Sequence, residues 1–250
     1  MSVSIHALNG IPKVQKNDDL VALILTALAQ ADLRICDGDI IVIAQKIVSK
    51  SEGRLYQLNS VTPCTQAIEL GLKTDKDPRL VQLILDESTE VVRSRTGVII
   101  VEHNIGLVHA NAGIDRSNIE GDDSALLLPL DPDKSAATIR KGLENHYGVH
   151  IGVVISDSMG RAWRNGTVGF AIGSSGVETV QDLIGQPDMF GRILETTSVG
   201  HGDELAAAAS IVMGQAGESI PVALIQGLPA KKTDLTAADL IREKSEDMFR

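Results

Sequence analysis

The sequence predicts an α+β protein whose mixed and antiparallel sheets are flanked by helices. Expected helices and pairs of short strands follow one another without the regular strand–helix alternation of a parallel α/β fold. Apolar residues make up 43% of the 250 residues and aromatic residues only 2%, so the core must be aliphatic. No repeat of fixed period and no low-complexity linker is visible. We therefore expect residues 1–250 to form a single unit, in which any two lobes would pack intimately.

Composition and charge narrow the classes of function. The 33 acidic residues outnumber the 23 basic residues, the net charge is −10, and no Lys/Arg-rich run is present. This balance argues against binding to the phosphate backbone of nucleic acids. No stretch approaches the roughly 18 apolar residues of a membrane span, and Cys36 and Cys64 are interpreted as reduced core thiols. We expect a cytoplasmic protein that binds neither nucleic acid nor membrane.

The first fifty residues predict a strand, a helix and a second strand. Residues 2–8 alternate in polarity and end at the turn sequence NGIP, as an edge strand would. An Asn-Asp-Asp sequence at 17–19 can cap a helix that runs through Ala31. The run IIVIAQKIVSK at 40–50 is rich in β-branched residues and predicts one strand that is covered on both faces.

The next segment predicts two helices followed by three short strands. Pro63 and Pro78 each lie in the first turn of an expected helix, a position at which proline is tolerated. Turn residues separate the apolar runs that follow. The three strands are expected at 90–93, 97–102 and 107–110.

The second half of the chain alternates amphipathic and buried segments. Residues 133–147 predict an amphipathic helix that is capped by Asp133 or Ser135. Further helices are expected at 176–183, 202–213 and 236–248. Buried strands are expected at 150–156, 166–172 and 220–226.

Two segments that leave expected strands carry carboxylates in glycine-containing loops. Asp115 lies in the sequence NAGIDRSN, and Asp157 lies in the sequence SDSMGR. Small-molecule sites gather at such strand ends, because the backbone is rigid while the side chain is free. Together with the oxygens of Ser158 and Gln215, the two carboxylates would suit a hard cation such as Mg²⁺. Taken singly, each aspartate is more typical of a loop or a helix cap than of a metal site.

Basic side chains and a glycine-rich loop add candidate anion contacts. Arg161 and Arg164 follow Asp157 closely, and arginine binds phosphate or carboxylate through two parallel hydrogen bonds. The alternative for both is a surface ion-pair network. Lys50 either contacts a nucleotide phosphate or is simply exposed. The glycines of 213–220 either let backbone amides approach a ligand or cap the preceding helix.

Four blocks resemble one known family, the coenzyme F420-0:L-glutamate ligases. They are GDIIVIAQKIVSKSEGR at 38–54, NAGIDRSN at 111–118, ISDSMGRAWRNGTVGFAIG at 155–173 and MGQAGESIP at 213–221. Their order and spacing agree with the family over essentially the whole chain. The resemblance implies a GTP-dependent ligase that adds L-glutamate to coenzyme F420-0, and to F420-1, through γ-linked amide bonds by way of an acyl phosphate. It also implies two divalent ions, Mg²⁺ or Mn²⁺, stimulation by K⁺, and an intertwined homodimer of interlocked lobes.

The resemblance also assigns residues. Asp115 and Asp157 would hold the first divalent ion, and Ser158 and Gln215 would belong to the second. Arg161 and Arg164 are our own candidates for binding the acidic substrate or developing charge. The residues expected to contact GTP are Ile11, Pro12, Lys13, Val14, Gln45, Lys46, Lys50, Asn118, Met213, Gly214, Gln215, Ala216, Gly217, Glu218, Ser219 and Ile220.

This chain departs from the family pattern at three places. Gln45 and Lys46 stand where some members have Ser and Thr, Ser158 replaces the more familiar Thr, and Gln215 stands where members can carry an acid. An amide oxygen brings less negative charge to a cation than a carboxylate does.

Two other interpretations of the same residues stay open at the level of sequence. The aspartate pair and the arginines would also suit a metal-dependent phosphohydrolase or phosphotransferase that acts on another anionic metabolite. A non-catalytic protein that binds a deazaflavin or a nucleotide is the third. No GxxxxGK[ST], GxGxxG, HExxH or GxSxG motif is present to indicate a different class.

Overall fold

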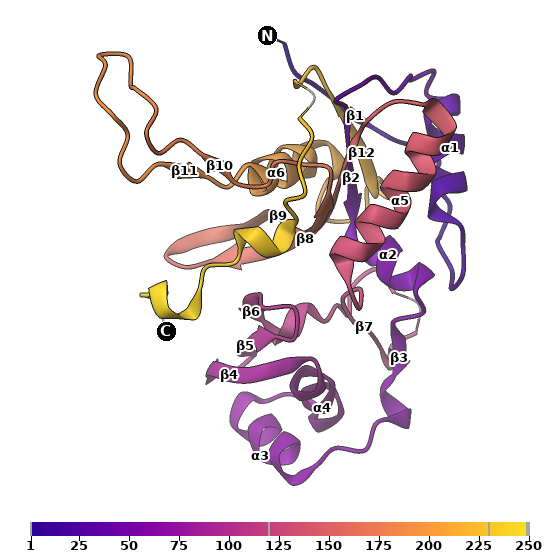
Figure 1. Ribbon diagram of the computed structural model, residues 1–250. Coiled ribbons are helices and arrows are strands. Elements are labelled where there is room, and N and C mark those ends of the chain that lie inside the picture. The colour runs from indigo at the N-terminus through magenta and orange to yellow at the C-terminus, as the bar shows by residue number, and fades with distance from the viewer. Residues whose placement is uncertain (1, 120, 230, 249–250) are drawn as a thin grey trace.

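The computed structural model describes residues 2–119, 121–229 and 231–248 and is built around one mixed sheet (Figure 1). Its five strands lie in the order β1-β12-β2-β8-β9. Only β2 and β8 run parallel, and the other neighbours are antiparallel. The strands are β1 (Ser4–Ala7), β12 (Val222–Gln226), β2 (Ile40–Ala44), β8 (Gly152–Arg161) and β9 (Arg164–Ser175). The predicted α+β class with mixed and antiparallel sheets is therefore confirmed.

Helices cover both faces of this sheet, which explains why its strands are apolar on both sides. On one face α1 (Leu20–Gln30) and α5 (Pro132–Tyr147) pack with Ile41 and Ile43 of β2. On the other face α6 (His201–Met213) packs with Ile40 and Val42. Successive side chains of a strand point to opposite faces, so each face of β2 enters a separate hydrophobic core.

A second part of the chain folds around a core of its own. Helices α3 (Thr65–Thr74) and α4 (Pro78–Asp86) pack on a three-stranded antiparallel sheet, and Figure 1 shows this part below the central sheet. Its strands are β4 (Ser88–Arg95), β5 (Val98–His103) and β6 (Val108–Ala110). The short antiparallel pair β3 (Leu55–Gln57) and β7 (Ser124–Leu126) connects it to the rest of the chain. We call residues 65–110 the three-stranded region.

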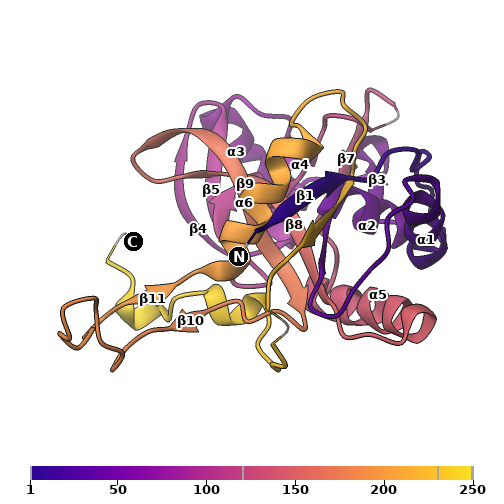
Figure 2. The same ribbon diagram turned by 90° about the horizontal axis from the view of Figure 1, so that it is seen from above.

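Two hairpins project from the body. The β8–β9 hairpin continues beyond the end of β2, because β2 pairs with β8 only as far as Ser156. The second hairpin consists of β10 (Gln181–Asp182), β11 (Ser198–Val199) and the long loop between them, and Figures 1 and 2 both show it reaching away from the sheet. None of the helices in the described part of the chain is long and apolar enough to cross a membrane.

The run at 40–50 is not one strand, contrary to the prediction. It divides into β2 and the helix α2 (Gln45–Ser51). Gln45 and Ser49 lie one helical turn apart, both are buried, and the Ser49 hydroxyl donates to Gln45 Oε1 over 2.8 Å. The β-branched residues predicted a strand locally, but burying this polar pair requires helical spacing.

The helix expected at 176–183 does not form either. Gly176 has φ +71°, and the chain then continues without helical structure to β10. Thr179 is fully buried, and its hydroxyl donates to the carbonyl of Thr236 over 2.7 Å. This contact with the C-terminal segment, which lies far away in the sequence, outweighs the local preference.

The C-terminal helix expected at 236–248 is replaced by two 3₁₀ turns. They span Ala237–Leu240 and Lys244–Glu246. Thr236 does form a capping box, but the ammonium of Lys244 bonds Glu90 of β4, so this segment follows the three-stranded region.

The two cysteines are free, but they are exposed rather than in the core as expected. Cys36 lies in the loop before β2, and Cys64 lies directly before α3. The remaining expected strands and helices are confirmed, with ends shifted by a few residues. The predicted cap of α5 is wrong: Asp131 caps it, and Asp133 instead accepts from the backbone N–H groups of Ser174 and Ala237.

Candidate active site

A cavity of about 960 Å³ opens where β2 and β8 end side by side. Ligand sites form at this edge of a parallel strand pair because the chain leaves both strands there in loops. The cavity brings together segments that are far apart in the sequence. Every residue expected to contact GTP or a metal ion lines it: Ile11, Pro12, Lys13, Val14, Gln45, Lys46, Lys50, Asp115, Asn118, Asp157, Ser158, Met213, Gly214, Gln215, Ala216, Gly217, Glu218, Ser219 and Ile220.

Asp157 comes from the end of the buried half of β8. The pairing of β8 with β9 shifts register between Ile155 and Ser156, and such bulges redirect the side chains that follow them. Ser158 is the next residue, and its hydroxyl donates to Gln215 Oε1 over 2.5 Å. One strand end therefore presents a carboxylate and a hydroxyl to the cavity.

Asp115 is delivered by a tight left-handed turn. Asn111, Ala112 and Gly113 all have positive φ, at 53°, 53° and 64°. Only glycine adopts this conformation without cost, so the turn stores strain, as functional sites often do. Directly after the turn, the backbone N–H and C=O of Asp115 exchange hydrogen bonds of 2.9 Å with Leu126. The carboxylate is thus attached to backbone that is held on both sides.

Gln45 lies between the two carboxylates. Its Nε2 donates to Asp115 Oδ2 over 2.9 Å, and its side chain also lowers the pKa of the Asp157 carboxyl. The Ser49 hydroxyl occupies its Oε1, so the amide nitrogen is the atom that faces the carboxylates. Gln45 is 1% exposed. A buried amide that is hydrogen-bonded at both its oxygen and its nitrogen holds the Asp115 carboxylate in place.

The electrostatics of the pair favour a cation. Burial raises the pKa of Asp157 to about 7, and the negative charge of Asp115 adds to the rise. The Ser158 backbone N–H, Lys46 and Gln45 oppose it without cancelling it. Two half-buried carboxylates that repel each other are stabilised by any positive charge placed between them.

The available donors fit a hard divalent cation. Among the described residues no group of three or more His, Cys, Asp and Glu side chains converges as a metal cluster. The oxygens of Asp115, Asp157, Ser158 and Gln215 nevertheless line one cavity. Mg²⁺ is commonly held by one or two carboxylates, with substrate phosphates and water as its remaining ligands. This set therefore suits a cation that arrives together with a phosphorylated substrate.

The rim of the cavity is tied together across the chain. Lys50 Nζ donates to the carbonyl of Asn118 over 3.0 Å, and Asn118 Nδ2 donates to the carbonyl of Ala216 over 3.0 Å. Backbone N–H groups, its own and that of Ala216, lower the pKa of Glu218. These bonds connect α2 and the loop after Asp115 with the glycine-rich loop that follows α6.

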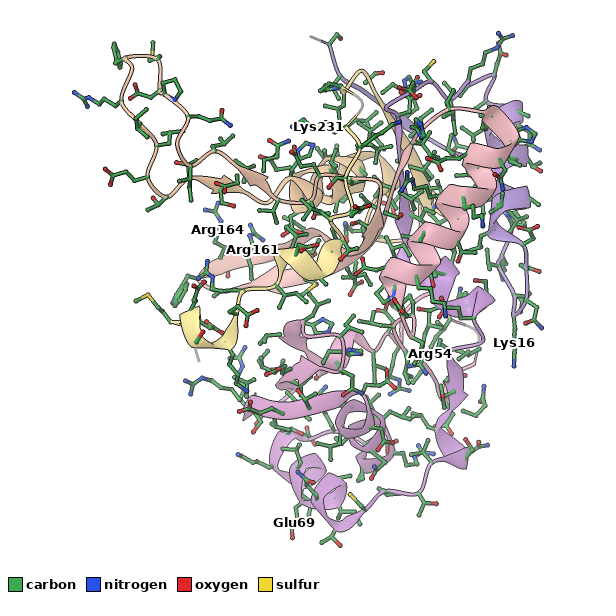
Figure 3. All side chains as sticks on the ribbon, viewed as in Figure 1. Lys16, Arg54, Glu69, Arg161, Arg164 and Lys231 are labelled. Carbon is green, nitrogen blue, oxygen red and sulfur yellow. The ribbon has the colours of Figure 1, made fainter. Side chains whose placement is uncertain are left out.

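Arg161 and Arg164 lie elsewhere. They pair with each other at the turn of the β8–β9 hairpin, where Arg161 Nη1 donates to the carbonyl of Gly166 over 3.1 Å. Neither is among the described residues that line the cavity. Figure 3 shows both at the projecting end of the hairpin, on the opposite side of the molecule from Lys16. The fold does not bring them to the aspartates of their own chain.

Several lining residues were not expected from the sequence. Lys16 extends over Gly53, where an added Cβ would lie 2.7 Å from the lysine Cδ. Ser117 lies beside Asp115 in the NAGIDRSN block, and its hydroxyl accepts from Lys46 Nζ over 3.1 Å. The position of Ser117 within a motif was a usable signal, whereas nothing local distinguishes Lys16 from other surface lysines.

Comparison with known proteins supplies the family. The family model described as F420-0:Gamma-glutamyl ligase matches residues 10–227. The coenzyme F420:L-glutamate ligase of Methanothermobacter thermautotrophicus is 44% identical over 252 residues, with 100% of both chains covered. The protein of the same name from Methanocaldococcus jannaschii is 48% identical, with 88% of both chains covered. The one from Archaeoglobus fulgidus is 38% identical, with 100% of this chain and 97% of the relative covered. The chain is therefore a ligase and belongs to the F420-0:gamma-glutamyl ligase family.

Proposed function

We propose that this chain uses GTP to add L-glutamate to coenzyme F420-0, and to F420-1, through γ-linked amide bonds. The relatives that match the chain over its full length are named as ligases that join glutamate to coenzyme F420. The observation that carries the nucleotide part is the convergence of Asp115 and Asp157 on Gln45, inside a cavity also lined by Lys13, Lys46 and Lys50.

The chemistry requires activation of the acceptor. A carboxylate is a poor electrophile toward an amine. In the proposed reaction an oxygen of the acceptor's terminal carboxylate attacks the γ-phosphorus of GTP, the bond to the bridging oxygen breaks, and GDP leaves. The glutamate amine then attacks the acyl carbon, loses its proton, and inorganic phosphate departs. Phosphoryl transfer of this kind depends on in-line placement and charge neutralisation.

The residues of the cavity divide this work between them. Asp115 and Asp157 would hold one divalent ion, Mg²⁺ or Mn²⁺, and Ser158 and Gln215 would contribute to a second. Such ions, when bound, neutralise the phosphates and orient the attacking oxygen. The lysines and the backbone amides of 213–220 would take the remaining phosphate charge. Stimulation by K⁺ stays a prediction.

A product assay tests the proposal. The enzyme is incubated with GTP, L-glutamate and F420-0, the products are analysed by mass spectrometry, and GDP is measured in parallel. We expect γ-glutamyl product and GDP release that depends on the acceptor. Release of phosphate from GTP or another metabolite without amide formation would favour the phosphohydrolase, and binding without GTP consumption would favour the non-catalytic protein.

We also propose that the chain forms a homodimer through its projecting hairpins. The loop between β10 and β11 exposes four large apolar side chains, among them Met189 at 88% and Phe190 at 78%. Clustered exposed apolar side chains of this kind mark association surfaces. A role for Arg161 and Arg164 in substrate binding would then require the cavity of the second copy. Light scattering of the wild type and of Phe190→Ser tests this, and a wild-type monomer at micromolar concentration would contradict it.

A further inference from the structure

Lys46 is placed unusually for a lysine in a cavity built to bind a cation. Its Nζ lies 3.0 Å from Asp115 Oδ2, the oxygen that also accepts from Gln45. The same ammonium donates to the hydroxyl of Ser117 over 3.1 Å and to its carbonyl over 3.3 Å. The lysine therefore occupies one of the oxygens through which Asp115 would hold a divalent ion.

The two partners of Asp115 differ in their freedom to move. Gln45 is buried and held by Ser49. The Asp115 carboxylate therefore cannot move away without breaking its hydrogen bond to Gln45. The side chain of Lys46 is 28% exposed and attached through four flexible methylenes, so it can leave by rotating its own bonds. A competing cation would therefore displace the lysine rather than rearrange the carboxylates.

The cavity offers the released ammonium a second role. Lys13 and Lys50 line the same space, as does the glycine-rich loop at 213–220. An incoming triphosphate would bring several negative charges there, and a compact ammonium on a flexible stem can follow them. The Lys46 ammonium would then neutralise Asp115 in the metal-free protein and phosphate in the protein that has bound the cation and the nucleotide.

We propose that Lys46 is a resident counter-ion of Asp115 that exchanges for the divalent cation and then turns to the nucleotide phosphates. This inference rests on the proposed function, because it presupposes a cation and a nucleotide in the cavity. It assigns Lys46 two successive partners and makes binding of the cation and binding of the nucleotide mutually favourable. It also gives a physical reason for a lysine beside a cation site.

Titration with Mn²⁺ in the absence of nucleotide, followed by electron paramagnetic resonance of the free ion, tests the exchange. Removing the competitor in Lys46→Met should tighten Mn²⁺ binding by roughly two- to fivefold, as expected for loss of a partly exposed ion pair. Lys46→Arg keeps the charge and should bind Mn²⁺ as the wild type does. Lys16→Met removes the same charge from the same cavity without touching Asp115, and should leave Mn²⁺ affinity unchanged.

The nucleotide side gives a second readout. With Mn²⁺ saturating and no acceptor present, Lys46→Met should bind GTP several-fold more weakly than the wild type, because the released ammonium is missing. The two effects have opposite signs, which general unfolding or loss of the cavity cannot produce. Circular dichroism and thermal unfolding of each variant confirm that it is folded.

Three results would overturn the inference. They are equal Mn²⁺ affinity in Lys46→Met and the wild type, an equal gain in Lys16→Met, and absence of Mn²⁺ binding in all of the variants. Failure of the proposed function has a different signature, in which the exchange is seen but incubation with GTP, glutamate and F420-0 yields no γ-glutamyl product.

Discussion

The two ends of the β8–β9 hairpin lie in opposite environments. At the inner end β8 is flanked by β2 and β9, and Asp157 and Ser158 follow directly where β2 stops. At the outer end β8 pairs with β9 alone among the described strands, and Arg164 is exposed while Arg161 is half-buried. Because β8 extends beyond the end of β2, its inner part lines the cavity and its outer part projects from the body of the protein. The difference teaches that closeness in sequence to Asp157 does not imply closeness to its chemistry.

The largest effect is expected at the inner end. Asp157→Asn removes a charge that the cation site needs while keeping the shape of the side chain, so ligation should fall by roughly a thousandfold or more. Mass spectrometry of γ-glutamyl product measures the loss. Asp115→Asn should behave alike, and both variants should keep the thermal unfolding of the wild type. Near-native turnover in either variant, with Mg²⁺ or Mn²⁺ present, would remove the site assignment.

A matched pair of glycine substitutions compares the two ends directly for stability. An added Cβ at Gly169, which pairs with Ser158, would lie 2.3 Å from the carbonyl oxygen of Ala206 in α6. Gly169→Ala should therefore push α6 away and lower the free energy of unfolding by ~1–3 kcal/mol. An added Cβ at Gly160 meets nothing within 4 Å, so Gly160→Ala should change the free energy of unfolding little. Urea unfolding measures both, and equal losses would break the comparison.

The free energy of unfolding should depend on pH because of His109, which packs against the turn before Asp115. Burial, with a smaller contribution from the charge of His103, lowers the pKa of His109 from 6.5 to about 4. His109 packs under the left-handed turn, since an added Cβ at Gly113 would lie 2.5 Å from its ring. Between those two pH values the unfolded chain binds the proton and the folded protein does not, so the folded state loses stability as the pH falls.

The expected loss is roughly 3 kcal/mol between pH 6.5 and pH 4, with full stability from this group above pH 6.5. Urea unfolding at a series of pH values measures it. His109→Gln, which cannot titrate, should flatten the profile in that window, whereas the exposed control His146→Gln should retain it. A profile for His109→Gln that matches the wild type would contradict the assignment.

The smallest effect on the fold is expected in the β10–β11 loop. Met189 is 88% exposed, so Met189→Ser should change the free energy of unfolding of the isolated chain by less than about 0.5 kcal/mol. The same substitution should weaken self-association, which analytical ultracentrifugation measures. A large loss of stability at protein concentrations where the chain is monomeric would show that this loop packs on its own chain.

Part of the fold followed from local patterns. Capping aspartates predicted α1 and α4, with proline at the first turn of α4, because these signals act within one turn of helix. The amphipathic pattern predicted α5, but its cap was misplaced. The division of 40–50 into β2 and α2 was missed because it depends on burial of Gln45 and Ser49, a tertiary property. The family resemblance predicted many of the residues that line the cavity but not the partners of Gln45 and Lys46.

By itself the sequence determined the α+β class, the aliphatic core, and the motif blocks that place the chain in its family, since composition, periodicity and motif spacing are local properties. Only the tertiary structure decided that Gln45 donates a hydrogen bond to Asp115, that Lys46 forms an ion pair with Asp115, and that Arg161 and Arg164 lie at the far end of the hairpin. Long-range packing decides which strands pair and where one strand extends beyond its neighbour, and no local sequence pattern encodes that packing.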